Sequence, residues 1–221
     1  MKVIFAVLLI VFCNFNLFAQ SNITKEEYAV YTAVFESISS NEHKSSFVIL
    51  DKTIEPDFKT LENELKQPSN SDEIFKTNPL NNLTPATFEL LLNDFKANNK
   101  QLAKVENQFS KEYKFDVISK NDINQLLEDG KKEYAKLPTS NEIITLGQEV
   151  VFMWQPFRRK YQNVNGYYNL SRVGFNADKN IALVYFNFVG INTGLSIFCI
   201  MEKVNDKWIF RKGFGSGFVD N

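Results

Sequence analysis

Glycine is confined to one part of this 221-residue chain. Residues 1–129 contain no glycine, and all nine glycines lie between Gly130 and Gly217. Glycine is disfavoured inside helices, whereas it is common at the turns, bulges and close backbone contacts of β-sheets. We therefore expect residues 20–140 to be mainly helical and residues 141–221 to form a sheet. Helices followed by strands are typical of an α+β fold, so a single α+β domain is predicted.

The first predicted helix begins after Thr24. Thr24 and Glu27 have the spacing of a capping box, in which each side chain accepts a hydrogen bond from the backbone of the other. Apolar residues then recur at spacings of three, four and seven, which places them on one face of a helix. These residues are Tyr28, Tyr31, Val34, Phe35 and Ile38. The pattern predicts a helix that packs on the core of the domain.

The rest of the glycine-free part mixes helices with short strands. Helices are expected over residues 57–67, from residue 84 or 85 onward, and over residues 121–137. The segments SFVILDKTI, residues 46–54, and YKFDVIS, residues 113–119, have the composition of strands. The N-terminal part is therefore helix-rich without being wholly helical.

The glycine-containing part has a β pattern throughout. Its segments are rich in β-branched and aromatic residues, and turn-forming residues separate the last four of them. Short connections favour antiparallel neighbours. We expect a C-terminal antiparallel sheet of about four to five strands, with the helices packed on one face. The predicted strands lie within residues 142–154, 166–176, 180–190, 194–204 and 207–215.

The first residues, MKVIFAVLLIVFCNFNLFAQ, have the layout of a secretory signal peptide. Lys2 precedes an apolar run from Val3 to Cys13, and Ala19 is small enough for the position before a cleavage site. The alternative is a membrane anchor, but Asn14 interrupts the run well short of the roughly 20 apolar residues of a membrane span. We expect cleavage of residues 1–19 and a mature domain, residues 20–221, that is exported to the periplasm or secreted.

Charge and residue counts argue against several kinds of partner. Lys2 is the one charged residue of the leader, so its removal leaves 24 of the 25 basic residues against 26 acidic ones. This near-neutral balance predicts neither nucleic-acid binding nor a polybasic membrane surface. The single histidine and the one cysteine outside the leader, Cys199, are too few for a usual zinc site. We expect no metal and no cofactor, and no membrane span after cleavage.

Arg172 is the first candidate ligand-binding residue, because it lies between apolar residues of a predicted hairpin. Residues 176–180, NADKN, are predicted to form the turn, with Phe175 opposite Ile181. The Arg172 guanidinium is suited to a carboxylate ligand, although a structural acid such as Glu202 and bulk water are alternatives. Gly174 is expected to mark a bulge or a close backbone approach, because no phosphate-loop spacing surrounds it.

A second set of candidates lies in FMWQPFRRKYQNVNGYY, residues 152–168, where aromatic and basic residues alternate. Such a mixture can bind glycans or acidic polymers by stacking and charge. The alternative is a bend in which the aromatic residues are buried and the cations are solvated. Together with Tyr185 of the following strand, the candidate ligand-binding residues are Trp154, Arg158, Arg159 and Arg172.

No catalytic motif accompanies these residues, so the sequence leaves catalysis open and favours a non-enzymatic role. We expect an exported module that binds a small molecule, a glycan or a protein of the cell envelope. The alternative is a small hydrolase that uses two carboxylates held across a cleft. Acidic residues near the ends of predicted elements are available for that chemistry; they are Glu26, Glu27, Asp51, Asp57, Asp116 and Asp122.

The segment SRVGFNADKNIALVYF, followed by MEKVNDKWIF, resembles the C-terminal half of a family of uncharacterised exported bacterial proteins. The resemblance is clearest over residues 166–211. It implies export and an α+β fold, and it implies no particular activity. Many members of that family have a connection rich in cysteine and glycine after the ALVY strand, whereas this chain has only FVGINTG, residues 188–194. A redox or metal role of that connection is therefore not expected for this chain.

Overall fold

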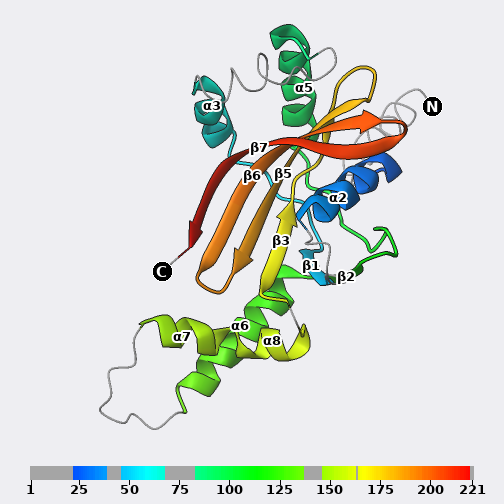
Figure 1. The fold of residues 1–221 in the computed structure, drawn as a ribbon. Helices are drawn as coiled ribbons and strands as arrows, with labels where there is room; N and C mark the ends of the chain where they lie inside the picture. Colours follow the sequence, from blue (N-terminus) through cyan, green and yellow to red (C-terminus); the bar gives the residue numbers. More distant parts are fainter. Residues whose placement is uncertain (1–21, 39–45, 68–82, 137–145, 163, 220–221) are drawn as a thin grey trace, which may run out of the picture.

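The structure is a computed structural model that describes residues 22–38, 46–67, 83–136, 146–162 and 164–219. The predicted signal peptide, residues 1–19, lies outside these ranges. Helices and a mixed sheet form an α+β fold, with most helices in the N-terminal part and the long strands in the C-terminal part (Figure 1). Within the described ranges, no helix combines the length and the apolar character needed to cross a membrane.

One sheet connects both parts of the chain. Its order is β2-β1-β3-β5-β6-β7, with the short β4 paired to β5. β1 is parallel to β2 and β3, whereas the other pairs are antiparallel. The strands are β1 (Ser46–Leu50), β2 (Lys114–Ile118), β3 (Gly166–Leu170), β4 (Gly174–Phe175), β5 (Ile181–Gly190), β6 (Thr193–Val204) and β7 (Lys207–Val219).

The predicted sheet is thereby corrected in two respects. It has seven strands instead of four or five, and it is partly parallel. The reason is that β1 and β2, from the helix-rich part, extend the sheet beside β3. The connection from β1 to β2 contains helices, as a crossover between parallel strands requires.

Helices cover both faces of the sheet, so the prediction of helices on one face is wrong. Alternate residues of β5 point to opposite faces. Val184 and Phe186 pack in the hydrophobic cluster that contains the apolar side of α2 (Lys25–Ile38). Leu183 and Tyr185 pack in a second cluster, with α3 (Phe58–Lys66) and α5 (Pro85–Asn98). Figure 1 shows α2 well apart from α3 and α5.

A third hydrophobic cluster anchors α6 (Lys120–Tyr134), α7 (Leu146–Met153) and α8 (Gln155–Lys160) at the lower end of Figure 1. Trp154 and Phe157 are its aromatic residues, and they pack with Val48 of β1. The prediction of a strand over residues 142–154 is wrong, because residues 146–153 form α7. Val150, Met153, Trp154 and Phe157 recur at helical spacing and share this cluster, so tertiary packing overrides the local β-branched composition.

Local signals predict the helix starts well. The Thr24 backbone N–H donates to Glu27 Oε2 at 2.8 Å, and the Glu27 N–H donates to Thr24 Oγ1 at 3.2 Å, which confirms the capping box. Asp57 caps α3 by accepting from the N–H groups of Lys59 and Thr60. Thr84 caps α5 and precedes Pro85 in its first turn. Each cap satisfies backbone donors that have no partner within the helix.

The predicted hairpin is present, with a different register. Phe175 pairs with Ala182 instead of Ile181, because Asn176 Oδ1 accepts from the N–H groups of Asn180 and Ile181 and closes the turn. The close backbone approach expected at Gly174 is confirmed, and the segment that approaches it is α5. A β-carbon at this position would lie 2.5 Å from the Phe95 Cα atom, so only glycine allows α5 to approach β4 this closely.

Candidate functional site

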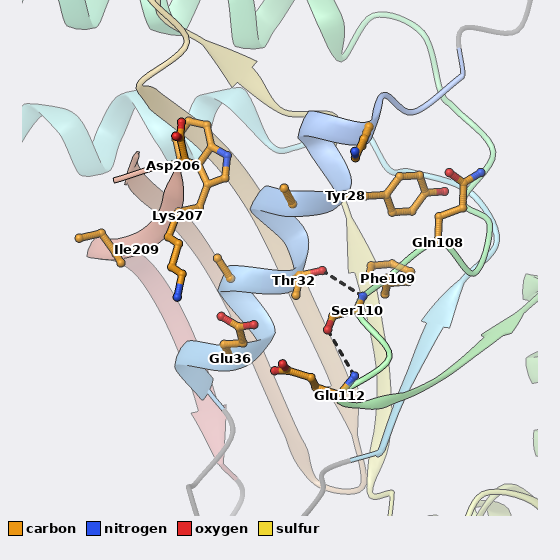
Figure 2. Close-up of a pocket in the computed structure, with 14 residues that line it drawn as sticks. Tyr28, Thr32, Glu36, Gln108, Phe109, Ser110, Glu112, Asp206, Lys207 and Ile209 are labelled. Atoms are coloured by element: carbon orange, nitrogen blue, oxygen red, sulfur yellow. Dashed lines mark hydrogen bonds between the residues drawn. The ribbon is translucent and has the colours of Figure 1, made fainter. Parts of the chain in front are cut away.

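An open groove of about 690 Å³ follows the exposed side of α2 (Figure 2). Its floor is the helix itself. One wall is the loop of residues 108–112, and the other is formed by residues 206–209, at the β6–β7 turn and the start of β7. The α2 residues that line the groove are Lys25, Tyr28, Ala29, Thr32, Ala33 and Glu36. The small side chains in the middle of this series leave the floor open to a ligand.

Contacts from α2 hold the 108–112 wall in place. The Glu106 N–H donates to the Tyr28 hydroxyl at 2.7 Å, and the Ser110 N–H donates to Thr32 Oγ1 at 3.5 Å. The Tyr28 ring meets the Phe109 ring edge to face, with centroids 5.2 Å apart. Both rings are largely buried, so they form a rigid aromatic edge of the groove.

The opposite wall depends on Trp208. Its indole Nε1 donates to Glu26 Oε1 at 2.7 Å, and the Lys203 ammonium lies 3.0 Å from the same oxygen. The Lys203 Nζ atom also lies 5.8 Å from the centroid of the Trp208 ring. Asn205 and Asp206 adopt left-handed backbone conformations, with φ of 49° and 62°, and form the tight turn before β7. This wall is thus tied to the first turn of α2.

Charges gather at the two ends of the groove. Lys25 belongs to the first turn of α2 at one end of the groove. Figure 2 shows Asp206 toward that same end, and Glu36, Glu112 and the ammonium group of Lys207 toward the other end. Burial, together with the charge of Glu112, raises the pKa of Glu36, and Lys207 opposes the shift. The last turn of α2 also has no basic residue to balance the negative end of the helix dipole. Two carboxylates, Glu36 and Glu112, thus face one cation, Lys207, at this end of the groove, which leaves it with an excess of negative charge.

Arg172, the first predicted site residue, lies outside this groove. Its side chain is 9% exposed, its Nε donates to Glu27 Oε1 at 2.6 Å, and its second terminal nitrogen donates to Glu27 Oε2 at 3.0 Å. Burial tends to lower the pKa of Arg172, but the hydrogen bonds and charge of Glu27 outweigh burial and raise it. A structural acid thus meets Arg172, as one alternative predicted, but the acid is Glu27. Glu202, named above as an example of such an acid, binds Arg211 instead.

The backbone of Arg172 is equally constrained. Its N–H donates to Asn99 Oδ1 at 2.7 Å, and its carbonyl accepts from Asn99 Nδ2 at 3.0 Å. The Tyr31 hydroxyl donates to the Ser171 carbonyl at 2.8 Å. Residues from α2 and from the end of α5 therefore fix the segment that connects β3 to β4. This network accounts for a buried arginine in the middle of the predicted strand.

The other predicted site residues are distributed over the molecule. Tyr185 is 8% exposed and packs against Phe198 on the face of the sheet opposite α2. Trp154 is 6% exposed, in the cluster under α8. Arg158 and Arg159 are brought together, and both line a separate hollow beside α8. The five residues thus do not form one site.

The residues of the α2 groove were missed by the sequence analysis. The apolar stripe of α2 predicts its buried face, and the remaining face, with Ala29, Thr32 and Glu36, is the part that lines the groove. Glu112 and Lys207 come from two distant segments without a motif. Cys199 is buried in β6, and burial raises the pKa of its thiol, so it is not poised as a nucleophile.

The described residues contain no group of three or more His, Cys, Asp or Glu side chains placed to hold a metal ion. Comparison of the chain with protein-family models, curated proteins and solved structures finds no match. Functional inference therefore depends on the geometry of the chain's own surface.

Proposed function

We propose that this protein is an exported, non-enzymatic binding module and that the α2 groove holds an extended peptide segment of a partner protein. The observation that carries this proposal is the groove itself. Its edges include Tyr28, Phe109 and Trp208, its floor carries small side chains, and its ends are charged. The leader-like first 19 residues support export.

The length of the groove fits a short extended peptide. Lys25 and Glu36 are eleven positions apart on α2, which corresponds to about 16 Å at the rise of an α-helix. An extended chain rises about 3.3 Å per residue, so roughly five residues fit along the floor. Small side chains at Ala29 and Thr32 allow the peptide backbone to lie close to the helix.

The charge distribution indicates the sequence and direction of that peptide. Glu36 and Glu112 outnumber Lys207 and favour a basic residue at their end of the groove. The flexible side chain of Lys25, at the same end as Asp206, favours an acidic residue at the other end. Apolar residues between them would contact Phe109 and Ile209. The preferred ligand is therefore a segment with an acidic residue, a short apolar stretch and a basic residue.

A library of labelled pentapeptides with these features, measured by fluorescence anisotropy against the mature chain, tests the proposal. Ala29→Phe fills the floor and is expected to weaken binding at least about tenfold, equivalent to 1.4 kcal/mol. The matched control is Ala97→Phe, on an exposed position of α5. Equal binding by both variants, or no binding by any peptide of the library, would contradict the proposal.

The second candidate, a carboxylate-based hydrolase, is supported by one observation. A raised Glu36 pKa beside a second carboxylate, Glu112, is a feature of general acid catalysis. Screening the mature protein against ester, glycoside and peptide substrates tests this alternative. Activity that is lost in Glu36→Gln and kept in Glu26→Gln would favour the hydrolase alternative. The absence of activity on every substrate tested would contradict it.

A further inference from the structure

A second hollow, of about 710 Å³, lies beside α8, at the end of the molecule away from α2 (Figure 1). Four of its lining residues recur at spacings of three, four and seven: Gln155, Arg158, Arg159 and Gln162. Within α8 this spacing places Gln155, Arg158 and Arg159 on one side. Gln162 lies beyond the helix end at Lys160 and lines the same hollow from the segment that follows. Val164 and Asn165 complete the lining.

The opposite side of α8 holds this polar row in position. Trp154 and Phe157 are 6% and 0% exposed, and both pack in the hydrophobic cluster against β1. Tyr161, one turn further on, packs against the same cluster and meets the Phe157 ring at 5.0 Å. Because the apolar side is anchored, the side with Arg158 faces solvent in a fixed orientation.

Among the described residues, the lining supplies positive charge and contains no carboxylate. These residues contribute two guanidinium groups, three carboxamides and the side chain of Val164. Arg159 is held by an ion pair with Glu133 of α6, outside the lining. For Arg158, the part of the chain that the structure describes contains no carboxylate within ion-pair distance, and the side chain is exposed.

The helix dipole explains only part of this arrangement. Cations in a last helical turn are favourable, and Arg158, Arg159 and Lys160 all occupy the last turn of α8. Lys160, however, points to the Tyr161 ring, with its Nζ atom 5.4 Å from the ring centroid, and it does not line the hollow. Two of three consecutive cations thus converge on one concave surface with the carboxamides.

We propose that the α8 hollow binds an acidic sugar residue and that Arg158 receives its carboxylate. A guanidinium group donates two parallel hydrogen bonds to a carboxylate, and Arg159 adds a second positive charge nearby. The carboxamides of Gln155, Gln162 and Asn165 both donate and accept, as the neighbouring sugar hydroxyls require. Val164, the one apolar residue in the described part of the lining, is buried, so this surface offers little to an apolar peptide side chain. This inference is independent of the α2 groove.

Isothermal titration of the mature chain with trigalacturonate tests the proposal. The matched ligand is the same trimer with its carboxyl groups methyl-esterified, which keeps the hydroxyls and removes the charge. We expect the acidic trimer to bind at least about tenfold more tightly than the ester, with an affinity that falls as salt is added. Equal affinity for both trimers, or no binding of the acidic trimer, would overturn the proposal.

Variants separate Arg158 from general surface charge. Arg158→Gln is expected to weaken binding of the trimer at least about tenfold, and Arg158→Lys is expected to weaken it less, because the charge remains without the two-pronged donor. The matched control is Lys160→Gln, which removes the same charge from the same helix outside the hollow. Retention of full affinity in Arg158→Gln, or an equal loss in Lys160→Gln, would contradict the assignment.

Inorganic phosphate distinguishes an acidic sugar from a free oxyanion. If the carboxylate and the hydroxyls are both recognised, phosphate at the same concentration displaces little of the bound trimer. Complete displacement would show that the hollow binds oxyanions without regard to the sugar, and the proposed ligand class would be wrong. Thermal unfolding of each variant, monitored by circular dichroism, establishes that a loss of binding does not reflect a loss of fold.

Discussion

The glutamates at the two ends of α2 have opposite surroundings. In the first turn, Glu27 is 2% exposed and bound to Arg172, and Glu26 receives hydrogen bonds from Lys203 and Trp208. In the last turn, Glu36 is exposed and lies beside a second carboxylate, Glu112. The same residue type thus fixes the fold at one end of the helix and gives the groove a negative charge at the other.

Helix α2 serves two purposes. The first turn of α2 connects to the β3–β4 segment through Glu27 and to β6 and β7 through Glu26, so it positions the floor of the groove against the sheet. The last turn of α2 places Glu36 beside Glu112 at one end of the groove, where the peptide proposed above would place its basic residue.

Breaking the buried ion pair between Glu27 and Arg172 is expected to cause the largest loss of stability. Glu27→Gln leaves the Arg172 guanidinium buried without its counter-charge, which typically costs about 3–5 kcal/mol of unfolding free energy. Urea denaturation of the protein measures this loss. Glu89→Gln, at an exposed position of α5, is the matched control and is expected to change stability by less than about 0.5 kcal/mol. Similar midpoints for the two variants would show that the pair contributes little.

This pair also marks the limit of what the sequence predicts. The capping box of Thr24 and Glu27 follows from local spacing, and Arg172 is conspicuous among its apolar neighbours. The ion pair joins positions 145 apart in the chain, and no local pattern specifies such a contact. Glu202 was named as an example of a structural acid that Arg172 could meet, but it pairs with Arg211. Long-range pairing is decided by the fold and not by the neighbourhood in sequence.

The elements themselves were predictable to the extent that their signals are local. Caps at Asp57 and Thr84 and the hairpin around residues 176–180 depend on contacts within a few positions. The segment 146–153 was assigned to a strand because Val150, Val151 and Phe152 favour β-structure. Its helical spacing mattered more once β1 and α6 supplied a surface to pack on. The α2 groove combines distant segments, so its composition could not be predicted.

Loss of the contact between Glu26 and Trp208 is expected to cause the second-largest decrease in the free energy of unfolding. Glu26→Gln removes the charge from the hydrogen bonds with Trp208 and Lys203, and because Glu26 is about one-third exposed the loss should be about 1 kcal/mol. Urea denaturation at neutral pH measures it, and a change in Trp208 fluorescence would report the altered wall. A stability equal to that of the unmodified chain would indicate that solvent replaces these bonds without cost.

The pH dependence of this effect has a defined sign. Burial opposes the shift, but hydrogen bonds from Lys203 and Trp208 lower the pKa of Glu26 below its ordinary value of 4.5. The folded protein therefore binds fewer protons than the unfolded chain at Glu26, so this contribution is complete above pH 4.5 and is lost as pH falls through the folded pKa. The stability difference between the unmodified chain and Glu26→Gln should shrink with acidification. A difference that grows in acid would contradict the direction of the shift.

Substitution of Glu36 is expected to change stability the least, and its pH dependence should have the opposite sign to that of Glu26. Its pKa is raised above 4.5 by burial and by the charge of Glu112, so the folded protein binds more protons than the unfolded chain in the window just above pH 4.5. Stability from this residue therefore falls as pH rises through that window. Glu36→Gln should stabilise the protein at neutral pH by less than about 0.5 kcal/mol, because Glu36 as a whole residue is exposed and its carboxyl is only partly buried, so solvent screens its charge.

A direct measurement is the titration of the Glu36 carboxyl carbon by nuclear magnetic resonance. In the unmodified chain the midpoint should lie above the ordinary value for glutamate, and Glu112→Gln should lower it, because the neighbouring negative charge is gone. Lys207→Gln should raise it further, since Lys207 opposes the shift. If Glu112→Gln left the midpoint unchanged, the two carboxylates would not share one end of the groove. There would then be no electrostatic argument for a basic residue in the bound peptide. A lowered Glu36 titration midpoint on peptide binding would instead identify this end of the groove as the one that receives the basic residue.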